Sequence, residues 1–250
     1  MLKIEKYVTM TPEQWEIVIE GMRNPKNSYD RIDSYSTYVK DYDTNREVAS
    51  EFFVGPNDQK LMMELKAGGP VHAKYLRMMP VWVTLTAPLY WWKGFDTYKV
   101  GTVANSCSTM HKIHAKEFTL EDFSCENLFD ADTKPVPEED YYLSVYIKDI
   151  KDEDISVYSD AIESLKITIR ALNFYRNKFI DTNSKKYWDQ MIQLLPSSYN
   201  QKRTVFLNYE VLSNIYKWRR NHKLDEWNVF CDWIETLPYP ELITGEVKNE

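Results

Sequence analysis

Phe95-Asp-Thr-Tyr-Lys-Val-Gly-Thr-Val-Ala-Asn-Ser-Cys-Ser-Thr-Met-His111 is the most informative segment of this chain, because more than half of its side chains are polar or charged. It follows an apolar run, Pro80-Val-Trp-Val-Thr-Leu-Thr-Ala-Pro88, and an aromatic cluster at residues 90–95, which together predict a buried strand. A polar segment beside the core must satisfy its groups internally or present them to a ligand. We therefore expect either an ordered connection bonded to its own backbone or part of a ligand site.

Helix and strand patterns continue on both sides of this segment. Thr11-Pro-Glu-Gln14 has the residues of a capped helix start, and the helix should stop near Asn24-Pro25. Apolar residues at helical spacing from Tyr158 to Phe179 predict a long helix, and its scattered aromatics indicate burial on more than one side. We expect a long loop or a hairpin in 26–56, a strand or helix entry at 205–209, a strand at 2–8, and helices at 57–66, 187–195, 211–217 and from 225.

Size and charge limit the classes of function. At 250 residues with no Gly/Ser-rich or Pro-rich linker, we expect a single domain over residues 1–250. A formal net charge of −7 argues against a broad nucleic-acid surface, although a few local cations suffice for one small anionic ligand. No apolar run approaches the ~20 residues that span a bilayer, and the cysteines have no scaffold spacing. We expect a reduced, cytoplasmic protein without a membrane partner.

The order of these features resembles the flavin-dependent thymidylate synthases, and more closely their bacteriophage-encoded relatives. The motif of that family is Arg-His-Arg, seven residues and a serine, and the corresponding stretch here is Tyr98-Lys99-Val100, seven residues and Ser108. An upstream Gly-His piece of the family is matched by Gly69 and His72. Its later Leu-Pro, Asn and Leu-Arg elements are matched by Leu195-Pro196, Asn208 and Trp218-Arg219.

The resemblance implies an α/β (α+β) fold, a sheet flanked by long helices. That family forms homotetramers with sites shared between subunits, and its Arg-His-Arg segment holds FAD and the uracil nucleotide. For this chain it implies a homo-oligomer, with FAD as candidate cofactor and dUMP as candidate substrate. Tyr98 and Val100 stand where the family has arginines, and neither side chain reproduces a guanidinium fork. The resemblance therefore implies ligand binding and names no catalytic residue.

Nine residues are candidate ligand-binding residues. They are His72, Trp92, Tyr98, Lys99, Asn105, Ser106, Ser108, Arg219 and Arg220. Trp92 offers a stacking surface for a planar ring, whereas for Trp82 on the predicted strand we expect core packing. At Arg219-Arg220, one guanidinium can stack on an aromatic ring while the other binds phosphate or carboxylate; the plainer alternative is an interaction with the helix carboxyl end.

Cys107, His111, His114 and Cys125 are residue types that bind zinc, but their spacing matches no common zinc module. Cys107 and His111 also lack the oxyanion motif that a nucleophilic cysteine needs. We expect no metal site and buried thiols.

Three functions remain open at this point. The first is binding of a nucleotide or nucleotide-like ligand on a thymidylate-synthase-like scaffold. The second is an active FAD-dependent methyltransferase acting on dUMP. The third is a structural or partner-binding protein, for example one that sequesters a signal, and a phage-encoded chain would act in the host cytoplasm. The sequence does not decide whether the chain is an enzyme.

Overall fold

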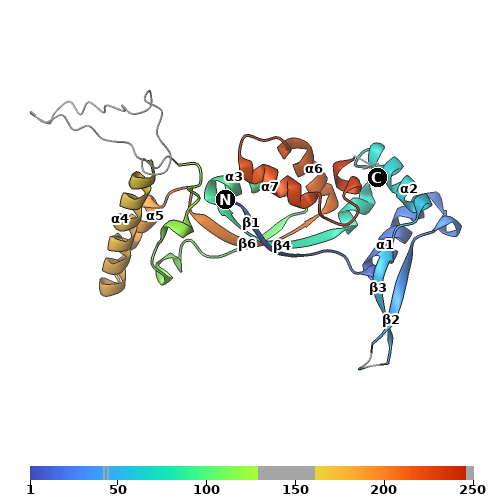
Figure 1. Cartoon of the computed structure of the whole chain (residues 1–250), viewed down its shortest axis with the longest axis horizontal. Coiled ribbons are helices and arrows are strands. Elements are labelled where there is room, and N and C mark those ends of the chain that lie inside the picture. The colour runs from blue at the N-terminus through green and yellow to red at the C-terminus, as the bar shows by residue number, and fades with distance from the viewer. Residues whose placement is uncertain (42, 44, 129–160, 246–250) are drawn as a thin grey trace, which may run out of the picture. The chain divides into compact units, whose positions relative to one another are not determined.

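The computed structural model describes residues 1–41, 43, 45–128 and 161–245 (Figure 1), and they form two compact units. We call them the helical unit (residues 1, 87–90, 107–128 and 161–201) and the sheet unit (residues 2–41, 43, 45–86, 91–106 and 202–245). Each unit is described by itself, and the prediction of one domain over the whole chain stays a prediction.

A four-stranded sheet organises the sheet unit. Its order is β1 (Lys3–Val8), β4 (Pro80–Pro88), β6 (Asn200–Asn208) and β5 (Val103–Ser106), with β1 antiparallel to β4 and β5 antiparallel to β6. The strands predicted at 2–8 and 80–88 are confirmed. Of the segment 205–209, residues 205–208 form the end of a longer strand, and Tyr209 is the first residue of a helix. The expectation that the polar run lies beside the core is wrong for β5, because its four side chains are exposed at the edge of the sheet.

Helices pack on one face of this sheet. α6 (Tyr209–Arg219) and α7 (Asp225–Ile234) lie on the same side of the strands as α3 (Leu89–Phe95) (Figure 1). Asn208 starts α6, since its Oδ1 accepts a hydrogen bond from the Val211 amide at 3.0 Å. The core between the helices and the sheet contains the buried rings of Trp91 and Trp227, whose centroids lie 4.7 Å apart. α8 (Glu241–Thr244) follows the helix predicted as the last one.

The opposite face of the sheet exposes a row of apolar side chains. Val8 pairs with Trp82, the Trp82 and Phe206 rings lie 5.3 Å apart, and Phe206 pairs with Val103. The expectation that Trp82 belongs to the core is wrong: it is 40% exposed, because alternation sends residues 81 and 83 to the core and residue 82 to this face. Such a row is the kind of surface that an oligomer covers.

The sequence before β4 forms two helices and a hairpin. α1 (Pro12–Arg23) has the predicted capping box between Thr11 and Gln14 and passes into a 3-10 turn at Asn24–Lys26. The hairpin alternative for residues 26–56 is confirmed by β2 (Tyr35–Lys40) and β3 (Glu47–Phe53), preceded by a 3-10 turn at Tyr29–Arg31. α2 (Pro56–Ala67) follows, and η3 (Lys74–Met78) is a 3-10 turn that leads into β4.

The helical unit contains α4 (Ala161–Thr182) and α5 (Lys185–Leu194), with short 3-10 turns at Ile113–Ala115 and Leu120–Asp122. Leu165, Ile169, Leu172 and Met191 belong to its core. The predicted long helix is confirmed from Ala161, and its expected start at Tyr158 lies outside the described residues. Ile167 and Phe174, one heptad apart, are exposed on α4. The homo-oligomer that this pattern favours stays a prediction, which light scattering against the 29.8 kDa monomer mass can test.

Among the described helices, none combines the length and the apolar character that crossing a membrane requires.

Candidate functional site

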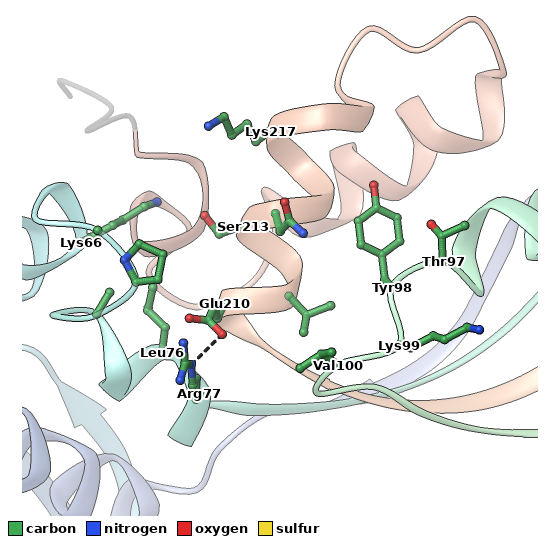
Figure 2. A pocket seen from close by; sticks show the side chains of 15 residues that line it. Lys66, Leu76, Arg77, Thr97, Tyr98, Lys99, Val100, Glu210, Ser213 and Lys217 are labelled. Atoms are coloured by element: carbon green, nitrogen blue, oxygen red, sulfur yellow. Dashed lines mark hydrogen bonds and ion pairs between the residues drawn. The ribbon is translucent and has the colours of Figure 1, made fainter.

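A cavity of about 700 Å³ lies in the sheet unit beside α6. Its walls come from α2 and η3 on one side of the helix and from residues 97–100 on the other (Figure 2). Leu76, Val100 and Val211 give it apolar surface, and Thr97, Ser213 and Asn214 give it neutral polar groups.

The turn after α3 is held against the start of α6 by a glycine. Gly101 has a φ of +78°, a left-handed conformation that side chains other than glycine rarely adopt. A Cβ at this position would lie 3.1 Å from both Asn208 Nδ2 and Val211 Cγ2. Glycine therefore permits both the turn and the close approach that places Tyr98, Lys99 and Val100 in the wall of the cavity.

The charge of the lining is opposite to that of the whole chain. Four cations, Lys66, Arg77, Lys99 and Lys217, line the cavity with one carboxylate, Glu210, for a formal charge of +3. The chain as a whole carries −7. Because clustered like charges raise the local potential, the cavity attracts anions that the rest of the surface repels.

Arg77 and Glu210 form an ion pair within the cavity wall. Arg77 Nε donates to Glu210 Oε2 at 2.7 Å, as the dashed line in Figure 2 shows. This hydrogen bond and the charge of Glu210 raise the pKa of Arg77 above its usual range. The other carboxylate oxygen, Glu210 Oε1, is buried and has no hydrogen-bond partner in the described part of the chain.

Lys66 connects the cavity to the carboxyl-terminal helix. Its Nζ donates to the Ile243 carbonyl at 2.6 Å and to the Glu241 carbonyl at 3.3 Å. Burial lowers the pKa of Lys66 to about 8, and the charge of Glu241 only partly opposes this shift. Lys66 is therefore charged at neutral pH and loses its charge around pH 8, well below an ordinary lysine.

Arg219 and Arg220 stand at the other end of α6 and do not line the cavity. The Arg219 guanidinium lies 4.7 Å from the Trp227 ring centroid, and its Nε donates to the Tyr98 hydroxyl at 2.9 Å. Arg220 pairs with Asp232 and, at 3.2 Å, with Glu235. Arg219 thus stacks on Trp227 of α7 and Arg220 binds carboxylates of the protein itself. Their role as ligand-binding residues stays a prediction.

The remaining candidate residues are spread over the chain. Trp92 is 1% exposed, and the Arg203 guanidinium lies 4.2 Å from its ring centroid, so both belong to packing rather than to an open stacking surface. Asn105 and Ser106 are exposed on β5, and His72 is exposed outside the cavity lining. The helical unit holds Ser108, whose Oγ accepts the His111 amide at 2.8 Å. Of the nine candidates, the cavity contains Tyr98 and Lys99.

Sequence inspection missed Lys66, Arg77, Glu210 and Lys217 as site residues. They belong to three elements and share no motif, so their meeting depends on how those elements pack. One sequence signal could have indicated Arg77: it is a charged residue between apolar residues, just before the predicted strand at 80–88.

The cysteines differ from expectation at one position. Cys107 is exposed, so the prediction of a buried thiol is wrong there, because Cys107 directly follows the exposed edge strand β5. Cys125 is half-buried. Cys231 is buried, which raises its pKa to about 12. Within the described ranges, no group of three or more His, Cys, Asp or Glu side chains could hold a metal ion.

Comparison with known proteins gives structural matches and no sequence matches: no family model and no curated protein matches the chain. Thymidylate synthase X (ThyX) from Helicobacter pylori, solved with FAD and dUMP, matches with a TM-score of 0.57 and 15% identity, over 99% of this chain and 99% of that one. The UMP/dUMP methylase PolB from Streptomyces cacaoi, bound with 5-Br UMP, matches with a TM-score of 0.52 and 11% identity, over 94% of this chain and 86% of that one. At such identities the matches show the fold, and they confirm the predicted α/β fold of the flavin-dependent thymidylate synthase type.

Proposed function

We propose that the cavity beside α6 binds a nucleotide or nucleotide-like ligand through its phosphate. The observation that carries this proposal is the formal charge of +3 on the lining of a cavity in a chain of net charge −7. A volume of about 700 Å³ lies within the range of small-molecule and cofactor sites, roughly 300 to 1,000 Å³.

Lys99 is the cation best placed to contact a phosphate from the motif-like segment. It is exposed, and the described part of the chain gives it no ion pair and no hydrogen bond. Its neighbour Tyr98 presents a ring held by Arg219, and Val100 and Val211 supply apolar surface for a base. Asn214 is then available to the sugar and to the edges of the base. The Thr97 and Ser213 hydroxyls donate to the carbonyls of Gly94 and Ile243 and can still accept a hydrogen bond from the ligand.

The ligand class is taken from the structural matches. ThyX from Helicobacter pylori was solved with dUMP and FAD, and PolB from Streptomyces cacaoi with 5-Br UMP. We therefore place uracil nucleotides first among ligands for this chain. Binding of FAD with methyl transfer to dUMP is the second candidate. FAD would supply flavin redox chemistry, and the lysines of the cavity fit its phosphates.

Calorimetric titration of dUMP, UMP and FAD into the purified chain tests the proposal. Replacing Lys99 with Ala should weaken binding of dUMP on the order of 10- to 100-fold, the range for a charged hydrogen bond. Lys93→Ala is the matched control, because Lys93 is exposed on α3 and does not line the cavity. Absence of binding by any of the three at millimolar concentration would support the structural or partner-binding alternative.

Flavin absorbance separates the two ligand candidates. A chain that purifies colourless, and that binds dUMP but not FAD, is a nucleotide binder without the flavin reaction. A chain that purifies yellow and retains flavin absorbance after gel filtration supports the methyltransferase candidate.

A further inference from the structure

Arg77 is the one arginine among the described residues that line the cavity. A guanidinium has five N–H donors, and Arg77 commits the one on Nε to Glu210. Its terminal nitrogens, Nη1 and Nη2, have no hydrogen-bond partner in the described ranges. The side chain lines the cavity and is 52% exposed.

Glu210 fixes the direction of that guanidinium. It belongs to the first turn of α6, whose start is set by the Asn208 cap. A carboxylate on a rigid helix holds Arg77 Nε at 2.7 Å, and the opposite edge of the planar group is left open. Because Glu210 orients the guanidinium before the ligand binds, binding costs less conformational entropy of the Arg77 side chain.

The negative charge of Glu210 does not cancel the attraction for an anion. A phosphate on the terminal nitrogens lies closer to the guanidinium than to a carboxylate on the Nε edge, and Coulomb energy falls with distance. Lys66, Lys99 and Lys217 also outnumber the single carboxylate of the lining. The pair therefore acts as an oriented donor within a positive cavity.

We infer that Arg77, positioned by Glu210, binds the phosphate of the ligand and supplies the guanidinium that the segment Tyr98-Lys99-Val100 lacks. This inference rests on the proposed function, because it concerns the same cavity. Planar bidentate donation to phosphate is a property of arginine that lysine does not reproduce. Arg77 comes from η3, so the fold restores with a different element what the motif-like segment has lost.

Paired titrations of dUMP and deoxyuridine, which lacks the phosphate, test this role. Arg77→Ala should weaken dUMP on the order of 10- to 100-fold and leave deoxyuridine unchanged. Arg77→Lys should remain at least about threefold weaker than wild type for dUMP. Lys74→Ala is the control, since Lys74 is exposed on the same 3-10 turn and outside the lining. Melting curves establish that each variant is folded.

Glu210→Gln separates positioning from direct contact. The amide oxygen can still accept Arg77 Nε–H, and one negative charge is removed, so dUMP should bind no more weakly than to wild type. Equally weakened binding of dUMP and deoxyuridine by a folded Glu210→Gln variant would mean that the carboxylate itself contacts the nucleoside, which overturns the positioning role.

The outcomes distinguish the two proposals. Binding of dUMP that depends on Lys99 but not on Arg77 overturns this inference and leaves the proposed function intact. Absence of binding of dUMP, UMP and FAD to the wild-type chain overturns both. Equal losses for dUMP and deoxyuridine in Arg77→Ala would show that Arg77 acts on the shape of the cavity and not on the phosphate.

Discussion

The two ends of α6 use their cations differently. At the amino end, Lys99 and Arg77 stand beside a cavity, and their remaining donors have no partner in the described part of the chain. At the carboxyl end, Arg219 lies against Trp227 and Tyr98, and Arg220 pairs with two carboxylates. At the amino end these cations are available to a ligand, whereas Arg219 and Arg220 at the carboxyl end hold the fold, although Lys217 of the last turn also lines the cavity.

The cations at the two ends differ in how many contacts they make with other protein side chains. A guanidinium packed on an indole and bonded to a hydroxyl loses those contacts if it turns to a ligand. When an exposed lysine without a protein partner binds a ligand, the cost is only the conformational entropy of its side chain. We therefore expect substitutions at the carboxyl end to change stability and substitutions at the amino end to change affinity.

Charge reversal at Lys99 should give the largest effect. Lys99→Glu replaces attraction by repulsion next to the phosphate, and we expect dUMP affinity to fall by about 3 kcal/mol, more than 100-fold. The midpoint of urea unfolding should stay close to that of wild type, because Lys99 is exposed. Unchanged affinity in the calorimeter would place the ligand elsewhere.

Removal of Arg219 should give the next largest effect, on stability. Arg219→Ala loses a stacked cation and a charged hydrogen bond, so we expect the free energy of unfolding to fall by about 2 kcal/mol. Affinity should fall less, through the Tyr98 ring that Arg219 holds. Urea unfolding of Arg219→Ala and Lys99→Ala in parallel measures this difference. Equal free energies of unfolding for the two variants would contradict the different roles of the two ends.

Affinity should depend on pH through Lys66. Below its pKa of about 8, the Lys66 ammonium attracts the ligand; above it, the neutral amine does not. The second ionisation of a phosphate, near pH 6, is complete across this range. We expect dUMP affinity to fall by about 1 kcal/mol between pH 7 and pH 9. Titrations of Lys66→Met should be flat over the same interval, and a slope that persists in this variant would assign the effect to another group.

Breaking the Arg220 pair should have the smallest effect. Asp232→Asn removes one partner of a solvent-exposed ion pair, for which about 0.5 kcal/mol of stability is typical, and screening at 1 M salt should abolish the difference. Affinity for dUMP should not change. A loss of affinity in this variant would extend the ligand site to Arg220.

Local patterns predicted much of the fold, and packing determined the site. Thr11 and Gln14 specify the start of α1 within one turn, so their sequence is sufficient. The Arg77–Glu210 pair joins residues 133 positions apart in the sequence, and no local pattern predicts such a contact. β5 was not predicted, because an exposed edge strand needs no alternation of apolar and polar residues. Its Asn105 and Ser106 were chosen as site residues only because they are polar.

A crystal structure of the chain grown with millimolar dUMP tests the central claim most directly. We expect nucleotide density in the cavity beside α6, with phosphate oxygens within hydrogen-bond distance of Arg77 or Lys99. An empty cavity in such crystals, or dUMP bound at β5 or at Arg219 and Arg220, would contradict it.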